Sequence, residues 1–388
     1  METALFHKKP FAPKSESVTL TISKDYVSDW GVWEAIRELS QNSLDSADKT
    51  ETKPIINYHK ETKSMIFISE KANLSTTTLV LGGGSKITDD AQRGKFGEGY
   101  KLALVVLIRL GIDVTIYNGN EVWEPEFIYS DMFKTELLTI HITKTHTNNK
   151  DLTIKLSGVE PDQAATSKHR VLLNRENSIG YKTRYGSILT EARFKGQIFV
   201  GGIFVCDSTT PLDHGYDFNP DQVDLGRDRG LMDTFDIQWL TSKMWNEASK
   251  YSKEALEITS KQISSNKGAT RLINNQSVTD QIVDHVSDEF YSQYTELAIP
   301  VANEEESRQV KEEYSNAIPV IVNDVQQSVI RRSEQYSQNK GELTVNTRVL
   351  SPCQQIKSIF SAYNENIGIT IEHVEEELLA RAGSWIAK

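Results

Sequence analysis

The sequence predicts a protein of α+β class with more than one domain, and three observations support this. Strand-like and helix-like segments alternate over residues 15–160. The length of 388 residues exceeds what one ordinary hydrophobic core organises and suggests about two or three domains. The longest wholly apolar run, residues 102–108, is too short to cross a bilayer, so we expect no membrane segment.

Residues 15–160 are expected to form the first domain, after a flexible tail at residues 1–14. Apolar runs bounded by turn residues predict strands at residues 17–23, 54–60, 64–70, 112–119, 122–130, 137–146 and 152–158. Helices are the other elements of this region. An α+β sandwich is the natural arrangement, because it buries the apolar faces of the strands against those of the helices.

Two helices are predicted in this first domain. Apolar residues at helical spacing indicate one over residues 29–49, with Asp29 as its N-cap. A run of apolar residues indicates a buried helix over residues 99–111. The segment between the strands and the second helix, residues 74–100, is rich in Gly, Ser and Thr and is predicted to be a long loop.

Two further regions follow. Residues 161–240 are expected to form a second, smaller α+β domain, with a strand pair within residues 196–207. Residues 241–388 are expected to be mainly helical, with one short strand in residues 317–324 and a helix-turn-helix in residues 354–387.

The charge balance narrows the classes of partner. Lys and Arg number 43 against 54 Asp and Glu, so the net charge is −11, which repels phosphate. Binding to nucleic acid is therefore not expected. The N-terminus has no apolar secretory segment, and the two cysteines give no disulfide framework, so a cytoplasmic location is expected. Cys206 follows a strand and is expected to be a buried small apolar residue.

The first candidate constellation lies on the first predicted helix. Glu38, Asn42 and Asp45 in RELSQNSLDS are spaced so that all three share one helix face. An amide oxygen suits a Mg²⁺ held jointly by protein and triphosphate, and a carboxylate one turn away can orient water for attack. The alternative is an ordinary solvated helix face.

The second constellation is GKFGEGYK, in which Gly94, Gly97 and Gly99 open the second helix. Glycines let backbone N–H groups approach phosphate oxygens, and a helix N-terminus favours negative charge. The preceding glycines, residues 82–84, offer the hinge freedom of a closing lid. The alternative is a flexible surface loop.

The two constellations in this order resemble the GHKL family of ATPases, which includes gyrase B, MutL, the ninety-kilodalton heat-shock chaperones and sensor histidine kinases. RELSQNSLDS resembles the N box of that family, and GKFGEGY resembles its second glycine box. The likeness covers about residues 15–160. It implies a Bergerat-type sandwich, with helices on one face of a mixed sheet, followed by a transducer-like domain.

The resemblance also implies ATP and Mg²⁺ as ligands and assigns roles to residues. Glu38 would be the general base and Asn42 the Mg²⁺ ligand, under a lid at residues 82–96. The nucleotide-binding residues expected on this basis are Asn42, Asp45, Glu70, Gly94, Lys95, Phe96, Gly97, Gly99 and Lys101.

One departure from the family concerns the base. The first glycine box, DxGxG, should follow the third strand, where its Asp accepts a hydrogen bond from the adenine amino group. This chain has SEKANLS there, without Asp or Gly. Glu70 is the candidate substitute acceptor. Losing a hydrogen bond to a charged group would cost about 1.5–3 kcal/mol of nucleotide affinity.

The second domain would correspond to a transducer, whose lysine reaches the γ-phosphate in the family. The candidate cations are Lys182, Arg184, Arg227 and Arg229, the last two of which are also consistent with a surface ion-pair cluster. A nucleotide-dependent homodimer and an unidentified protein partner of the C-terminal region are further expectations.

Two interpretations of function remain. The first is a slow Mg²⁺-dependent ATPase that uses lid closure as a conformational switch. The second is a non-catalytic interaction module with a degenerate pocket, acting through its acidic helical tail. Glu38 favours the first, because a protein without catalysis has no need for a base one turn from the metal ligand.

Overall fold

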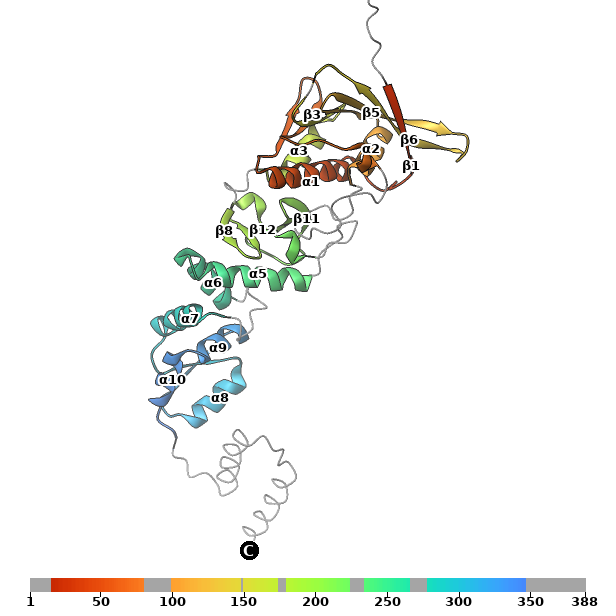
Figure 1. Ribbon diagram of the computed structural model, residues 1–388. Helices are drawn as coiled ribbons and strands as arrows, with labels where there is room; N and C mark the ends of the chain where they lie inside the picture. The colour runs from red at the N-terminus through yellow and green to blue at the C-terminus, as the bar shows by residue number, and fades with distance from the viewer. Residues whose placement is uncertain are drawn as a thin grey trace, which may run out of the picture. The chain divides into compact units, whose positions relative to one another are not determined.

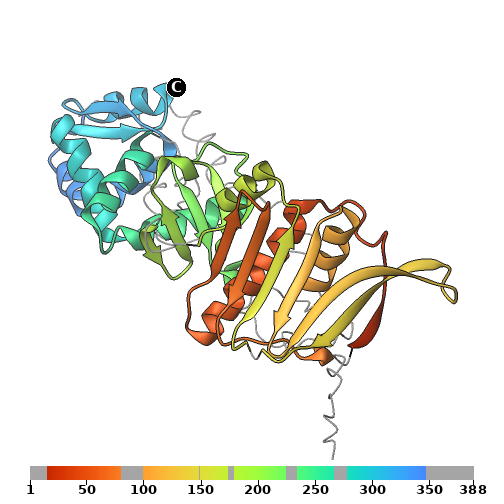
Figure 2. The same ribbon diagram turned by 90° about the horizontal axis from the view of Figure 1, so that it is seen from above.

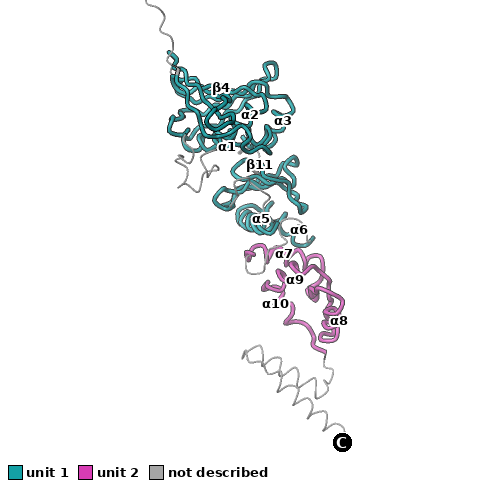
Figure 3. The backbone as a smooth tube through the Cα atoms, turned by 90° about the vertical axis from the view of Figure 1, so that its right-hand side faces the viewer, with its two compact units in different colours: residues 1–277 teal, residues 278–388 magenta. Residues whose placement is uncertain are grey.

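The computed structural model describes residues 15–79, 99–147, 149–173, 179–223, 234–265 and 278–346. The chain divides into two compact units, residues 1–277 and residues 278–388, coloured separately in Figure 3. No helix within the described ranges combines the length and the apolar character that crossing a bilayer requires. The predicted helices in residues 354–387 lie outside the described part of the chain.

The first unit begins with a seven-stranded sheet of order β1-β6-β5-β4-β7-β3-β2. Its strands are β1 (Ser15–Ser23), β2 (Ile55–His59), β3 (Ser64–Ser69), β4 (Asp113–Asn118), β5 (Glu121–Ser130), β6 (Thr135–Lys144) and β7 (Leu152–Ser157). All seven predicted strands are confirmed. The expectation of a mixed sheet is wrong here, because every neighbouring pair is antiparallel. The connection from β3 to β4 passes over β7, which lies between these strands and runs antiparallel to both.

Helices cover one face of this sheet (Figures 1 and 2). They are α1 (Val32–Thr50) and α2 (Gly99–Arg109), with α3 (Pro161–Arg170) packed against α1. The N-cap of α1 is Gly31 and not Asp29, because the backbone N–H of Gly31 donates to the Glu34 carboxylate at 2.8 Å in a capping box. The helix therefore begins three residues later than predicted.

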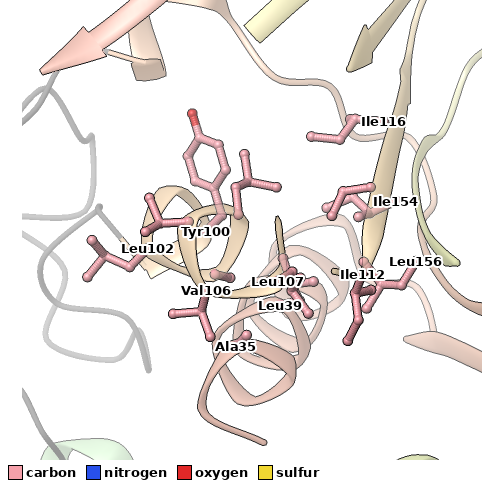
Figure 4. Packing of buried hydrophobic residues seen from close by; sticks show 14 of the residues in the cluster. Ala35, Leu39, Tyr100, Leu102, Val106, Leu107, Ile112, Ile116, Ile154 and Leu156 are labelled. Carbon is pink, nitrogen blue, oxygen red and sulfur yellow. The ribbon is translucent and has the colours of Figure 1, made fainter. Parts of the chain in front are cut away.

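The core of this sandwich lies between the helices and the sheet. The apolar run that predicted the second helix is buried in α2. Leu39 of α1, Leu107 of α2 and Leu156 of β7 are all part of the same cluster, which Figure 4 shows from close by. The apolar face of α1 packs in this core, so the helix cannot rotate about its axis. The direction of its other side chains is therefore fixed.

The second part of this unit is a five-stranded sheet of order β11-β10-β12-β9-β8, in which β10 and β12 are parallel. Its strands are β8 (Ile179–Thr183), β9 (Gly186–Leu189), β10 (Gln197–Val200), β11 (Ile203–Asp207) and β12 (Gly215–Phe218). The predicted strand pair is confirmed as β10 and β11, and Cys206 is buried as expected.

Two helices, α5 (Thr234–Ala248) and α6 (Lys253–Ser265), follow this sheet. The predicted domain boundary between residues 240 and 241 is wrong, because it falls inside α5. Leu240, Met244 and Trp245 of that helix join the core of the second sheet, so the helix belongs to it. Short 3₁₀ helices are η1 (Thr76–Leu79), η2 (Ala192–Phe194) and η3 (Pro220–Gln222).

The second unit is an α/β fold around two parallel strands. Its elements are α7 (Asp280–Gln293), β13 (Ala298–Val301), α8 (Glu304–Glu313), β14 (Ile318–Ile321), α9 (Asp324–Arg331) and α10 (Glu334–Gly341). The strand predicted within residues 317–324 is confirmed as β14. Its partner β13 was not predicted, because four residues that include Pro300 give too short a pattern.

Candidate functional site

A pocket of about 360 Å³ lies between α1, the strands β3 and β7, and the residues that follow β3. Both apolar and polar side chains line it. The lining residues are Leu39, Asn42, Ser43, Asp45, Ser46, Lys49, Thr50, Phe67, Ser69, Lys71, Ala72, Asn73, Leu74, Thr78, Tyr100, Leu152 and Ile154. An apolar cleft with a few convergent polar groups is the usual form of a site for a small molecule.

The predicted helix face points into this pocket. Asn42 and Asp45 both line it, one turn of α1 apart. The side-chain nitrogen of Asn42 donates to the backbone oxygen of Glu38 at 2.8 Å. Because the amide nitrogen is turned toward the helix backbone, the amide oxygen lies on the other side of the group, as an oxygen ligand would require.

Glu38 does not line this pocket, although it was predicted to share a face with Asn42 and Asp45. Its carboxylate pairs with Arg37, the preceding residue of the helix. One carboxylate oxygen, Oε1, accepts from Nε and Nη2 of Arg37 at 3.2 and 3.0 Å. This pair is almost buried, with 8% of the Arg37 side chain and 12% of the Glu38 side chain exposed. The guanidinium carbon of Arg37 also lies 5.2 Å from the ring centre of Trp30. The Glu38 carboxylate is therefore held in one orientation.

The two sequence constellations meet at Gly99. The second carboxylate oxygen of Glu38 lies against the α-carbon of Gly99, so closely that a β-carbon at this position would collide with it. Glycine is required here for close approach, since its backbone φ is not in the left-handed region. Gly94, Lys95, Phe96, Gly97 and the predicted lid lie outside the described residues.

Lys101 is placed differently from the prediction. Its side chain is fully buried, and Nζ donates to the backbone oxygen of Thr78 at 3.0 Å, so it is not among the described residues that line the pocket. Its neighbour Tyr100 does line the pocket, and its hydroxyl lies 3.0 Å from that of Thr78. Burial raises the pKa of Tyr100 to about 12, so the phenol stays protonated at neutral pH.

The segment after β3 corrects the prediction for Glu70. Ser69, Lys71 and Asn73 line the pocket, and Glu70 is not among the described lining residues. Phe67 and Ser69 face α1 because strand residues two apart share a face, so the next residue points elsewhere. Lys71 has a φ of 55°, in the left-handed region that glycine adopts most readily.

Two polar side chains that sequence reasoning missed hold this segment in place. The buried side chain of Asn118 accepts from the backbone nitrogen of Leu74 at 2.8 Å and donates to its backbone oxygen at 2.9 Å. Asp151 accepts from the backbone nitrogen of Lys71 at 2.9 Å. Asn118 stands before a glycine at the end of a strand, a pattern that reads as an ordinary turn, and gave no signal of this role.

None of the candidate transducer cations that the structure describes lines the pocket. Nε of Arg184 lies 2.8 Å from the Glu247 carboxylate on α5, and 67% of the Arg184 side chain is exposed. Lys182 lies on β8 and is not a lining residue. Arg227 and Arg229 lie outside the described residues.

The described residues contain no group of three or more His, Cys, Asp or Glu side chains that could hold a metal ion by themselves. A cation at Asn42 would thus need further oxygen atoms from a ligand. No protein-family model and no curated protein matches this chain.

Proposed function

We propose that the chain is a Mg²⁺-dependent nucleoside triphosphatase of GHKL type, with ATP as the nucleotide that the resemblance implies, and a Bergerat-type sandwich as its nucleotide-binding domain. One observation carries this proposal: the helix face with Asn42 and Asp45 lines a pocket of about 360 Å³, while Glu38 on the same helix meets Gly99 of the second motif. Glu38 of the first motif and Gly99 of the second, both selected from the sequence alone, are thus in contact.

In this proposal the base of the nucleotide occupies the pocket between α1 and β3, and the phosphates extend toward Glu38 and the start of α2. Asn42 would hold Mg²⁺ through its amide oxygen, whose orientation fits this role. Bound Mg²⁺ supplies positive charge that offsets the charge on the phosphates.

Glu38 is the proposed general base. It takes a proton from a water molecule as that water attacks the γ-phosphorus, and the bond from this phosphorus to the leaving diphosphate oxygen breaks. Arg37 orients the carboxylate from one side, and Gly99, which has no side chain, allows the start of α2 to approach it closely on the other. Positioning of this kind can supply much of the rate enhancement over the uncatalysed reaction, and it needs no covalent intermediate.

The test measures phosphate release from Mg-ATP beside ATP binding, in the wild type and in two variants. Glu38→Ala should abolish turnover and keep binding, whereas Asn42→Ala should weaken binding of Mg-ATP. Turnover that survives in Glu38→Ala contradicts the assignment of the base. A wild type that binds nucleotide without turnover favours the second candidate, a non-catalytic interaction module. The supporting observation for it is the segment SEKANLS, which lacks the DxGxG pattern.

A nucleotide-dependent homodimer forms part of the proposal, as the family resemblance implies, together with an unidentified protein partner of the C-terminal region. Light scattering with a non-hydrolysable ATP analogue tests the first of these. The expected result is a doubling of mass upon binding, and an unchanged mass at saturating nucleotide counts against it.

A further inference from the structure

Arg109, the last residue of α2, binds four backbone carbonyl groups of the segment between β1 and α1. Its Nη1 donates to the backbone oxygens of Lys24 and Tyr26 at 3.1 and 3.0 Å. Its Nη2 donates to those of Val27 and Trp30, both at 3.0 Å. A guanidinium carries its donors in a fixed plane, so this one side chain sets the relative positions of the four carbonyl groups.

The segment held by Arg109 has a conformation that its own sequence does not favour. Val27 has a φ of 48°, which a β-branched residue rarely adopts. Its backbone oxygen accepts from Arg109 and also from the backbone nitrogen of Trp30, at 3.0 Å in each case. A strained conformation of this kind persists where the surrounding contacts impose it. Arg109 therefore helps to fix the place of Trp30.

Trp30 contacts the ion pair of the proposed base. Its side chain is buried, and the guanidinium carbon of Arg37 lies 5.2 Å from its ring centre. Arg37 in turn donates to Oε1 of Glu38 at 3.2 and 3.0 Å. Because Trp30 precedes α1, the position of its ring depends on the segment that Arg109 holds. A continuous chain of contacts thus leads from Arg109 to the Glu38 carboxylate.

The opposite end of α2 meets the same carboxylate directly. Gly99, the first residue of this helix, lies against the second carboxylate oxygen of Glu38. The helix has 11 residues, so its two ends lie about 15 Å apart along the axis. One helix therefore limits the Glu38 carboxylate from both sides, through Gly99 at its start and through Arg109 at its end.

We infer that α2 sets the direction of the Glu38 carboxylate from both of its ends, and that Arg109 is a positioning residue for this base. It acts through Trp30 and Arg37. The inference rests on the proposed function, because it concerns the base of the same site. Arg109 is not among the described residues that line the pocket, so its loss should slow turnover and leave nucleotide binding intact.

The test measures phosphate release over a range of Mg-ATP concentrations with the full chain. Arg109→Met removes all four hydrogen bonds, so kcat should fall by at least about tenfold while KM changes by no more than about twofold. Arg109→Lys keeps the positive charge and offers three donors on a single nitrogen, so a smaller fall in kcat is expected.

Arg332→Met is the matched control. It removes a guanidinium that donates to the backbone oxygen of Val278 at 2.8 Å, in the unit that contributes no described lining residue. It should change neither kcat nor KM.

A double-mutant cycle separates positioning of the base from a merely structural role. If Arg109 acts through Arg37, the variant that combines Arg109→Met with Arg37→Met should have a kcat within about twofold of that of Arg37→Met alone. Two effects that multiply would overturn the inference, because the two arginines would then act independently. An unchanged kcat in Arg37→Met would overturn it as well.

The outcomes also separate the inference from the function on which it rests. Turnover that requires Glu38 but is unchanged in Arg109→Met overturns the inference and leaves the proposed function standing. A raised KM with an unchanged kcat does the same, because it places the effect in binding. If both Arg109 variants lack the circular dichroism of the folded wild type, Arg109 serves the fold alone and the inference is overturned. A wild type without turnover overturns both.

Discussion

Glu38 illustrates how a single side chain can be fixed by the groups around it. Arg37 holds one of its carboxylate oxygens with two hydrogen bonds and is itself stacked on Trp30. The other oxygen lies against the α-carbon of Gly99. Because both sides of the carboxylate are occupied, its direction is set before any ligand arrives, which is what a positioned base requires.

We expect Gly99→Ala to displace this carboxylate. The added β-carbon collides with the Glu38 side chain, so turnover should fall by about a hundredfold. The free energy of unfolding should fall by about 1–3 kcal/mol, as for other overpacked sites. Turnover assays and denaturant titration measure the two effects.

Gly341→Ala is the matched control, because a β-carbon there meets no atom within 4 Å. It should leave turnover unchanged and raise stability by at most about 1 kcal/mol. An unchanged Gly99→Ala variant would show that the carboxylate can move aside at no cost.

At the scale of residues, the sequence predicted only part of the helix face correctly, because Glu38 pairs with Arg37 and does not line the pocket. Asn42 and Asp45 line the pocket as the 3.6-residue repeat requires. It failed for Glu70 and Lys101, which are each one position away from a lining residue. The direction of these two depends on where a strand ends and a helix begins, and motifs do not fix that within one residue.

At the scale of elements, the segment after β3 takes its shape from the strands beside it. Asn118 at the end of β4 bonds both polar backbone groups of Leu74, and thereby holds a wall of the pocket. This segment contains no glycine over residues 70–79, and Lys71 nevertheless adopts the left-handed region. The wall is therefore maintained by tertiary contacts and not by local flexibility.

We expect Asn118→Ala to loosen this wall. It removes two hydrogen bonds and leaves the backbone groups of Leu74 without these partners, so stability should fall by about 1–3 kcal/mol. Hydrogen exchange at Leu74 should accelerate and nucleotide should bind more weakly. Asn57→Ala, exposed on the edge strand β2, should stay within about 0.5 kcal/mol of the wild type. Equal effects of the two variants would contradict the role given to Asn118.

The pH dependence of the second unit should reflect Glu306 on α8. Burial by itself raises the pKa of this carboxyl group, but hydrogen bonds from the backbone of Ala302 and from Arg331 and Gln327 outweigh burial and hold the pKa below its ordinary value of 4.5. Since the pKa is lower in the folded state, the stabilisation is present above pH 4.5 and is lost as pH falls further.

Glu306→Gln should therefore destabilise the chain at pH 7 and much less at pH 3.5. Calorimetric unfolding of the wild type and the variant at both pH values measures the difference. A difference in stability between the wild type and the variant that is larger at the acidic pH than at pH 7 would contradict this prediction.

Length alone does not separate the strands that the sequence predicted from those it missed, because β10 and β14 have four residues each, as do β9, β12 and β13. The seven strands of the first sheet follow from apolar runs that end in turn residues, and α2 follows from its apolar run. Of the elements with four or five residues, β9, β12 and β13 gave no usable period. The partners of β12 and β13 are not the next segments along the chain, so these pairings depend on tertiary packing.

At the scale of the whole molecule, every described residue that lines the pocket lies in the first of the two units. That unit has its own cores for each of its sheets, and a cluster of Leu44, Val171 and Ile203 joins α1 to the second sheet. Nucleotide binding should thus be a property of this unit.

We expect the chain ended after residue 277 to bind nucleotide with the affinity of the full chain, because no described lining residue is removed. Calorimetric titration of both proteins makes the comparison, with circular dichroism to establish folding. A tenfold loss of affinity in the folded shorter chain would show that the second unit contributes to the site.

Thr78 has a consequence for how this chain can change over evolution. Its hydroxyl meets that of Tyr100, and its carbonyl accepts from Lys101, so the positions on either side of residues 80–98 are fastened to each other. The ends of an inserted or shortened segment would still be brought together by these bonds. Doubling the length of a closed loop costs only about 0.6 kcal/mol. A variant with residues inserted or removed between these two anchors should therefore keep the same sandwich.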